Sequence, residues 1–195
     1  MKRLSVAIAG LLLAACSSMP AWVPGSGWTT LIDGDKGLEN FDRVGDANWR
    51  AEGGAIVADK GATGGHLVTR NSYKDFQLRA EFWADHGTNS GIFIRIQDPK
   101  KIGANNSYEV NIFDKRPDQS YRTGGIVDVA KPSAMINTGG KWNTFDITAQ
   151  GPKLMVTLNG TRTVDVEHKG HVRGPIALQY GAGTVKFRNV RIRTL

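Results

Sequence analysis

From Trp28 to its end, the chain consists of short runs of alternating hydrophobic and polar residues, separated by Gly, Asn and Asp. Such alternation, with turn residues about every 8–12 positions, is typical of an all-β sandwich or barrel. The Asn159-Gly160 pair predicts a hairpin turn, because both residues readily take the positive φ angles of a type I′ turn. The clearest predicted strands are Phe76–Ala84, Gly91–Gln97, Tyr108–Asp114, Thr144–Ala149, Leu154–Leu158, Thr161–Glu167, Pro175–Gln179 and Val185–Arg193.

The alternation also predicts which side chains share a face of each strand. In the strands at 76–84, 91–97 and 108–114, one face is largely aliphatic and the other mixes charged, amide and aromatic residues. If these strands are neighbours in one sheet, their mixed faces form a polar and aromatic platform suited to binding. A solvated face without function is the alternative. The mixed faces carry Gln77, Arg79, Glu81, Trp83, Phe93, Arg95, Gln97, Glu109, Asn111 and Phe113.

Basic residues outnumber acidic ones by 25 to 18, which gives a formal net charge of +7. Such an excess raises the question of a nucleic-acid partner. However, no block of Lys and Arg is dense enough to follow a phosphate backbone, so the sequence argues against that class. In the last predicted strand, Lys186, Arg188, Arg191 and Arg193 alternate with apolar residues, and a slip at Asn189 predicts a bulge. These charges indicate the solvated face of a surface strand.

The N-terminus has the pattern of a bacterial lipoprotein precursor. A basic start is followed by an apolar run at 4–15, which is too short to span a bilayer, and the run ends at Leu13-Ala14-Ala15-Cys16, which resembles a lipobox. An unmodified Cys in a signal segment is the alternative. We expect a signal peptide at 1–15, a tether at 16–27 lipidated on Cys16, and one β-sandwich domain at 28–195. Ser17 after the cysteine favours the outer membrane of the cell envelope.

Several motifs in this order resemble those of the 3-keto-disaccharide hydrolase family, whose members are also described as 3-keto-glucoside 1,2-lyases and 3-keto-2-hydroxy-glucal hydratases. The resemblance spans Trp28 to Leu195 and implies a concanavalin A-like jelly-roll sandwich of two antiparallel sheets, with a concave sheet that binds sugar. The motifs are Phe76-Gln77-Leu78-Arg79-Ala80-Glu81-Phe82, Asn89-Ser90-Gly91-Ile92-Phe93-Ile94-Arg95, Tyr108-Glu109-Val110-Asn111-Ile112, Thr123-Gly124-Gly125-Ile126, Trp142-Asn143, Leu158-Asn159-Gly160 and Gly174-Pro175-Ile176-Ala177-Leu178-Gln179.

The chemistry implied by this resemblance is elimination from a sugar oxidised at C3. The keto group makes the C2 hydrogen acidic, and the glycosidic oxygen on C1 can then leave. This requires a base near C2 and a cation or hydrogen-bond donor at the developing enolate oxygen. We predict Glu109 as the base or acid and Arg95 as the enolate stabiliser, both on the platform. A cross-strand ion pair between the two is the alternative.

The remaining platform residues are predicted to bind the substrate. Glu81 is a second carboxylate, Asn89 and Asn111 could hydrogen-bond sugar hydroxyls, and Trp83 or Phe93 could stack on a ring. Two classes of function stay open: an enzyme acting on 3-keto-glycosides and a non-catalytic glycan-binding lipoprotein. The expected partners are a carbohydrate and, through lipidated Cys16, the membrane.

Histidines and carboxylates give only weak indications of a metal. His168 and His171 are expected in a loop after a strand and are not predicted to bind zinc. His66 is expected to be structural, and His86 is expected at the rim of the platform. We predict no cofactor. Concanavalin A-like folds often hold Ca²⁺ in loops, which leaves Ca²⁺ open at Asp114 or Asp128.

Overall fold

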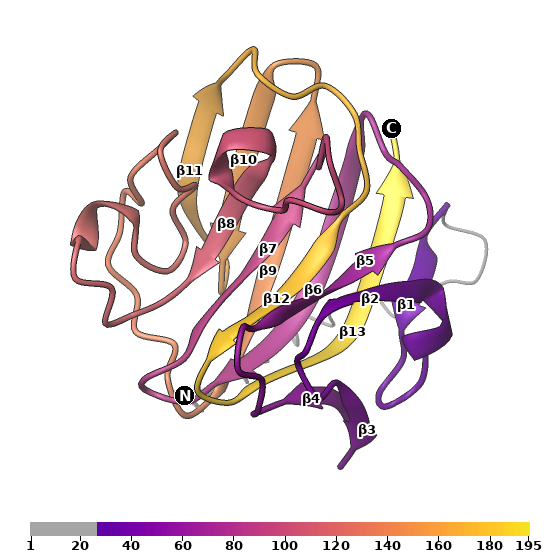
Figure 1. Cartoon of the computed structure of the whole chain (residues 1–195). Coiled ribbons are helices and arrows are strands. Elements are labelled where there is room, and N and C mark those ends of the chain that lie inside the picture. Colours follow the sequence, from indigo (N-terminus) through magenta and orange to yellow (C-terminus); the bar gives the residue numbers. More distant parts are fainter. Residues whose placement is uncertain (1–26) are drawn as a thin grey trace, which may run out of the picture.

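The computed structural model describes residues 27–195, which fold into two antiparallel β-sheets packed face to face (Figure 1). The predicted all-β sandwich is confirmed. The predicted signal peptide, Cys16 and residues 16–26 of the predicted tether lie outside the described residues. Within residues 27–195, no helix has the length and apolarity needed to cross a membrane.

The larger sheet has eight strands and the smaller has five. The eight-stranded sheet runs in the order β11 (Thr161–Glu167), β10 (Lys153–Leu158), β9 (Trp142–Gln150), β6 (Phe76–Ala84), β13 (Val185–Thr194), β4 (Ala55–Ala58) and β3 (Arg50–Glu52), and β1 (Thr29–Ile32) also pairs with β13. The five-stranded sheet runs β2 (Phe41–Gly45), β5 (Gly65–Thr69), β12 (Ala177–Ala182), β7 (Asn89–Ile94) and β8 (Tyr108–Ile112). Three 3-10 turns, η1 (Leu38–Asn40), η2 (Ala104–Asn106) and η3 (Gln119–Tyr121), lie in connections.

The eight predicted strands correspond to β6–β13, with ends shifted by at most three residues. The predicted hairpin is confirmed, since Asn159 and Gly160 have φ angles of 50° and 82°. The predicted bulge is also confirmed, because Asn189 has a φ of 50° and the β13–β6 register shifts there. The shorter strands β1–β5 were not predicted.

Alternation places the hydrophobic core between the two sheets. From β6, Leu78 and Phe82 point inward, where they meet residues such as Ile92 of β7 and Val110 of β8. Phe82 stacks on Phe145 with ring centroids 4.9 Å apart. Each such buried side chain contributes about 1.5–3 kcal/mol relative to exposure. The residues between these inward positions therefore face outward from either sheet.

The predicted single platform is wrong, because its strands belong to different sheets. β6 lies in the eight-stranded sheet, whereas β7 and β8 are neighbours in the five-stranded sheet. A turn at 85–88 carries the chain from β6 in the eight-stranded sheet to β7 in the five-stranded sheet. The Asp85 carboxylate stabilises this turn by accepting hydrogen bonds from the backbone N–H groups of Gly87 and Thr184, at 2.7 Å each. Glu81 and Trp83 consequently face away from Phe93, Glu109 and Asn111, on the opposite side of the sandwich.

Candidate active site

A row of residues crosses the outer face of the five-stranded sheet. The register pairs His66 of β5 with Gln179 of β12, Gln179 with Gly91 of β7, and Gly91 with Asn111 of β8. We call His66, Gln179, Gly91 and Asn111 the polar row. Directly opposite residues in a sheet have Cβ atoms about 4.5–5.5 Å apart, so a single small molecule can contact neighbouring members.

Glu109 belongs to the adjacent row on the same face. The register places Glu109 of β8 opposite Phe93 of β7. Phe93 lies opposite Ala177 of β12, and Ala177 lies opposite Val68 of β5. Apart from Glu109 this row is hydrophobic. Val68, Phe93, Ala177 and Ile96 form a small cluster separate from the main core, joined by the partly buried Val44 and Ile102. We call these six residues the apolar patch.

Three side chains of the polar row hold buried polar atoms without a hydrogen-bond partner. These atoms are His66 Nε2, Gln179 Oε1 and Asn111 Oδ1, and they make up half of the six such atoms found in the described residues. The Asn111 amide is held in place because its Nδ2 donates to Tyr121 O at 2.5 Å. Leaving a buried polar group unsatisfied costs about 1–3 kcal/mol. Three such groups in one row, with Gly91 between Gln179 and Asn111, indicate a surface built to hydrogen-bond a polar ligand.

The pKa of Glu109 is shifted toward neutrality. Burial raises it from 4.5 to about 7, the charge of nearby Arg116 opposes this rise, and the charge of Asp128 adds to it. The backbone is fixed by a hydrogen bond from Val127 N to Glu109 O of 3.0 Å. A carboxyl with a pKa near 7 is half ionised at neutral pH, so it can both take up and return a proton.

His66 is neutral at physiological pH, because burial lowers the pKa of its imidazole from 6.5 to about 4. Its ring meets Phe93 edge to face, with centroids 5.3 Å apart. A structural role was expected for His66 from the sequence, and Gln179 was given no role in the site. In the structure, both side chains lie in the polar row. The sequence pattern could have indicated the position of His66. Side chains alternate along Gly65-His66-Leu67-Val68, and because Leu67 faces the core, His66 faces outward.

Gly91 lies between the Gln179 amide group and the Glu109 side chain. A Cβ at this position would lie 3.2 Å from Val110 O, 3.3 Å from Gln179 Oε1 and 3.4 Å from Glu109 Cγ. The amide oxygen of Gln179 and the Glu109 side chain therefore both border the small space above Gly91. Glycine lets these two side chains lie close to the β7 backbone, and any side chain at position 91 would be crowded by them.

Arg95 does not lie beside Glu109, contrary to the prediction. It adopts a φ of 54°, which interrupts the strand alternation so that Ile96 joins the apolar patch. The guanidinium is only 1% exposed. It donates to Lys74 O at 2.6 and 2.9 Å, Gly151 O at 2.9 Å and His171 O at 3.1 Å, and forms an ion pair with Asp75 at 3.1 Å. All of these contacts tie loops together, and they do not place Arg95 in the polar row.

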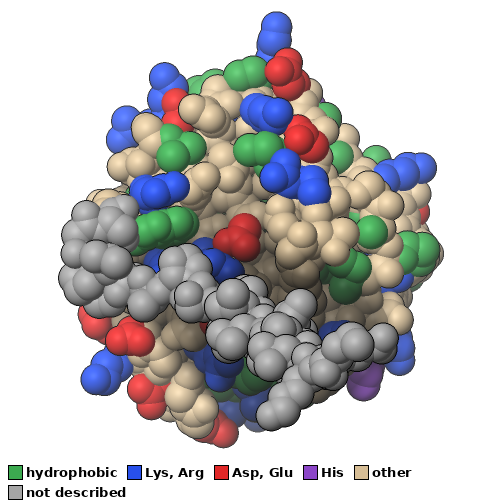
Figure 2. Space-filling view, turned by 180° about the vertical axis from the view of Figure 1, so that it is seen from behind, with side chains coloured by type: hydrophobic (Ala, Val, Ile, Leu, Met, Phe, Trp, Pro, Cys, Tyr) green, Lys and Arg blue, Asp and Glu red, His purple; other side chains and the backbone are tan. Residues whose placement is uncertain are grey.

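Glu81 and Trp83 lie on the outer face of the eight-stranded sheet, away from the polar row. Glu81 accepts from Arg188 Nε at 2.8 Å and from Asn189 Nδ2 at 3.1 Å. Lys186 Nζ lies 5.0 Å from the Trp83 ring centroid, a cation–π contact. Figure 2 shows the side of the molecule opposite to Figure 1, where Lys and Arg lie beside Asp and Glu. The prediction that Glu81 and Trp83 share one binding face with Glu109 is therefore wrong.

The other predicted binding residues lie on or beside the polar row. Asn111 is a member of it. Asn89 begins β7 two residues before Gly91, so it faces outward on the same side. Phe93 belongs to the apolar patch and is only 2% exposed, so its ring offers no open stacking surface, contrary to the prediction.

In the described residues, no group of three or more His, Cys, Asp or Glu side chains is arranged to hold a metal ion. Both oxygens of Asp114 are engaged by the hydroxyls of Thr123 and Thr138 and the backbone N–H groups of Thr138 and Gly139. Asp128 is exposed and has a φ of 59°. His168 and His171 follow β11 in a loop, as predicted, and His168 Nδ1 lies 3.0 Å from Tyr108 Oη.

Comparison with solved structures extends the fold assignment. A protein from Parabacteroides distasonis ATCC 8503 named as a candidate glycosyl hydrolase matches with 25% identity and a TM-score of 0.70, over 86% of this chain and 99% of that chain. A second such structure from the same strain matches with 18% identity and a TM-score of 0.68, over 87% and 89% of the two chains. The carbohydrate binding module CBM66 from Bacillus subtilis matches with 17% identity and a TM-score of 0.60, over 90% and 100%.

The fold and the polar row define a concanavalin A-like β-sandwich protein with a candidate ligand site on its five-stranded sheet. The chain belongs to the 3-keto-alpha-glucoside-1,2-lyase-like domain family, whose model matches residues 27–193. No match was found among curated proteins.

Proposed function

We propose that this protein is a carbohydrate-active enzyme that cleaves 3-keto-glucosides by elimination between C1 and C2. The observation that carries the proposal is the placement of Glu109, with its pKa of about 7, beside the unpaired polar atoms around Gly91. Family membership supports the substrate class. The lipobox-like sequence at Cys16 supports a location in the cell envelope, which membrane fractionation of Cys16→Ser tests.

In this proposal the oxidised ring lies over Gly91. The Glu109 carboxylate removes the proton from C2, and the electron pair of that bond forms a C1–C2 double bond as the bond from C1 to the glycosidic oxygen breaks. The leaving oxygen takes up a proton from the Glu109 carboxylic acid or from water. The products are an alcohol and a 2-hydroxy-glucal that retains the C3 ketone, and the reaction needs no oxidant. Addition of water across the double bond then completes hydrolysis.

The polar row supplies the complementary hydrogen bonds. Neutral His66, in the tautomer with a proton on Nε2, donates to the C3 keto oxygen, on which negative charge develops as C2 loses its proton. Gln179 Oε1 and Asn111 Oδ1 accept from sugar hydroxyls. Donors fixed before the reaction stabilise such an enolate better than water does, because they need no reorganisation. His66 thereby takes the role that sequence reasoning gave to Arg95.

The direct test is incubation of residues 27–195 with methyl 3-keto-α-glucoside. We expect methanol release with a transient enone absorbance in the ultraviolet, and exchange of the C2 hydrogen when the reaction is run in deuterium oxide. Methyl glucoside with an unoxidised C3 is the control and should remain intact. Binding of the keto sugar without methanol release or C2 exchange would instead identify a non-catalytic glycan-binding protein.

Gly91→Ala should lower kcat/KM for this substrate by about 10- to 100-fold, because the added methyl group occupies the space bordered by Gln179 and Glu109. Gly87→Ala is the matched control. A Cβ there would meet only Asp85 Oδ1, at an ordinary 3.5 Å. Steady-state kinetics and thermal melting of both variants make the comparison. Unchanged kinetics in Gly91→Ala would show that the reacting sugar ring does not lie over residue 91.

A further inference from the structure

The outer face of the eight-stranded sheet carries an excess of basic side chains, most of them on β13. Glu81 pairs with Arg188 at 2.8 Å and Asp146 pairs with Arg79 at 3.4 Å, so both carboxylates are already engaged. Within residues 27–195, the three remaining cations form no ion pair with an acidic residue. The outward-facing charged residues of β6, β9 and β13 are Arg79, Lys186, Arg188, Arg191, Arg193, Glu81 and Asp146.

Two of these arginines oppose each other across neighbouring strands. The β13–β6 register places Arg191 directly opposite Arg79. Like charges at directly opposite positions of a sheet repel each other and destabilise the pairing. A negatively charged surface lying over β13 would offset this repulsion. The charge pattern of the face is therefore complementary to an anion.

Tryptophan rings lie against the cations that have no acidic partner. The guanidinium carbons of Arg191 and Arg193 lie 5.4 and 5.1 Å from the centroid of the Trp28 ring. Lys186 makes the corresponding contact with Trp83, as described above. Tryptophan is enriched where membrane meets water, because its ring sits at the level of the lipid headgroups. Basic residues beside such rings are attracted to anionic lipids.

The chain enters the sandwich at this same face. Trp28 directly precedes β1, and β1 pairs with β13. Cys16, the predicted site of lipidation, precedes Trp28 by 12 residues, a length of chain that can span at most about 40 Å. A lipid on Cys16 therefore keeps the domain close to the membrane surface, with the point of attachment beside Arg191 and Arg193.

We propose that the outer face of the eight-stranded sheet, centred on β13, docks on a membrane surface that contains anionic phospholipids. The inference uses the predicted lipidation of Cys16 and does not depend on the proposed catalytic function. Lys186, Arg191 and Arg193 contact the lipid phosphate groups, and Trp28 lies at the level of the headgroups. Acidic polysaccharides share the charge of these lipids, but a tether that ends beside the basic residues favours the membrane.

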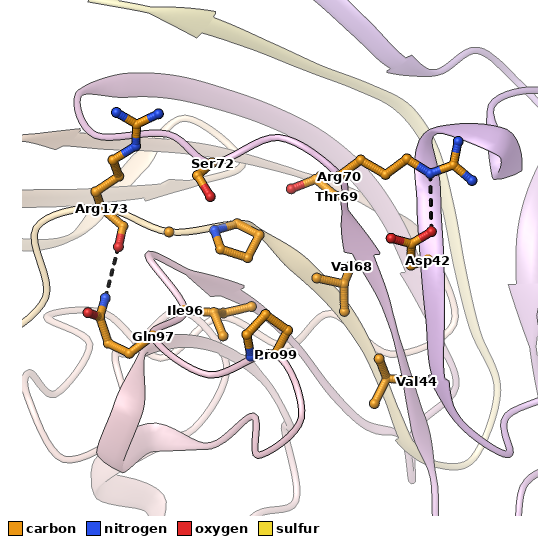
Figure 3. A pocket seen from close by; sticks show the side chains of 12 residues that line it. Asp42, Val44, Val68, Thr69, Arg70, Ser72, Ile96, Gln97, Pro99 and Arg173 are labelled. Atoms are coloured by element: carbon orange, nitrogen blue, oxygen red, sulfur yellow. Dashed lines mark hydrogen bonds and ion pairs between the residues drawn. The ribbon is translucent and has the colours of Figure 1, made fainter.

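This docking fixes the orientation of the candidate active site. Because the two sheets pack face to face, their outer faces point in opposite directions (Figure 1). A cavity of about 510 Å³, shown in Figure 3, lies beside the polar row on the outer face of the five-stranded sheet. With the eight-stranded sheet on the membrane, the polar row and this cavity face the aqueous phase.

The test compares two double variants of the mature chain, residues 16–195, with Cys16→Ser so that no lipid is attached. Lys186→Gln/Arg191→Gln removes two cations from the proposed docking face. Neither cation has an acidic partner within residues 27–195, so the fold should be kept. Arg70→Gln/Arg173→Gln is the matched control, which removes the same charge from the lining of the cavity in Figure 3.

Binding is measured by co-sedimentation with vesicles of phosphatidylcholine that contain about 30% phosphatidylglycerol. We expect the apparent Kd of Lys186→Gln/Arg191→Gln to rise at least about tenfold and that of the control to change less than about twofold. Binding of the Cys16→Ser chain should also weaken when NaCl is raised from about 50 to about 500 mM, because salt screens exposed charges. Thermal melting checks that both double variants are folded.

Three results would overturn the inference. Equal weakening in both double variants would show a response to net charge alone, without a docking face. Equal binding of the Cys16→Ser chain to pure phosphatidylcholine, or no binding to either vesicle, would exclude anionic lipid as the partner. Binding to soluble polygalacturonate as tight as that to the vesicles would identify an acidic polysaccharide as the occupant. None of these measurements uses turnover of a keto sugar, so they leave the proposed function to its own test.

Discussion

Glu109→Gln should lower kcat for methyl 3-keto-α-glucoside by about 10²–10⁴-fold, the usual contribution of a general base. The amide has nearly the shape of the carboxyl group but cannot accept the C2 proton. For the wild-type protein, kcat/KM should rise with pH through about 7, because only ionised Glu109 can act as the base. Steady-state kinetics between pH 5 and pH 9 measure both effects.

The same substitution should increase stability at alkaline pH. Burial raises the pKa of Glu109 from 4.5 to about 7, so between these values the folded protein holds a proton that the unfolded chain has released. The stabilisation from the neutral carboxyl group is therefore complete below pH 4.5 and is lost as the pH rises through 7. Gln stays neutral, so the variant should exceed the wild type by about 2–3 kcal/mol at pH 8 and equal it near pH 4.

His66 has the opposite pH dependence in both proteins. Its lowered pKa of about 4 gives stability that is present above pH 6.5 and is lost as the pH falls toward 4. Urea denaturation of the two proteins at matched pH values cancels this contribution. Glu167→Gln, at an exposed site on β11, is the control and should leave activity and stability unchanged. Full turnover by Glu109→Gln would exclude Glu109 as the base.

The sequence predicted the long strands well because their alternation extends over many residues. β6 and β11 were predicted at their observed bounds, and Asn159-Gly160 fixed the hairpin between β10 and β11. β1–β5 were missed because they are only three to five residues long and are separated by glycines such as Gly37 and Gly64, whose φ angles are positive. So few residues carry too little periodic signal to distinguish a strand from a loop.

The candidate site was only partly predictable, because alternation gives the faces of each strand but not the sheet to which the strand belongs. Glu109 and Asn111 were placed on the outward face of β8, where they lie. The pairing of β12 with both β5 and β7 brings His66 and Gln179 to them from distant parts of the chain. Arg95 lies away from the predicted face because of a single positive φ angle. A non-glycine residue seldom adopts such an angle, and the alternation of hydrophobic and polar residues around Arg95 does not reveal it.

Arg95→Met should destabilise the protein by about 3–5 kcal/mol, because it removes the donor from a buried ion pair and from three carbonyl oxygens. Methionine fills similar space but cannot hydrogen-bond, so Lys74 O, Gly151 O and His171 O lose their partner. Arg79→Met is the matched control. Its guanidinium pairs with Asp146 at 3.4 Å with both side chains about half exposed, so the cost should stay within about 1 kcal/mol. Urea denaturation at pH 7 measures both.

Arg95→Lys distinguishes a structural role from a catalytic one. Lysine keeps the positive charge but not the planar fork that reaches three carbonyl groups at once, so most of the stability loss should persist. Below the unfolding transition, the folded fraction should still turn over methyl 3-keto-α-glucoside at nearly the wild-type kcat, since Arg95 does not face Gly91. A fully stable Arg95→Lys protein with strongly reduced kcat would instead support the role of enolate stabiliser that the sequence predicted for Arg95.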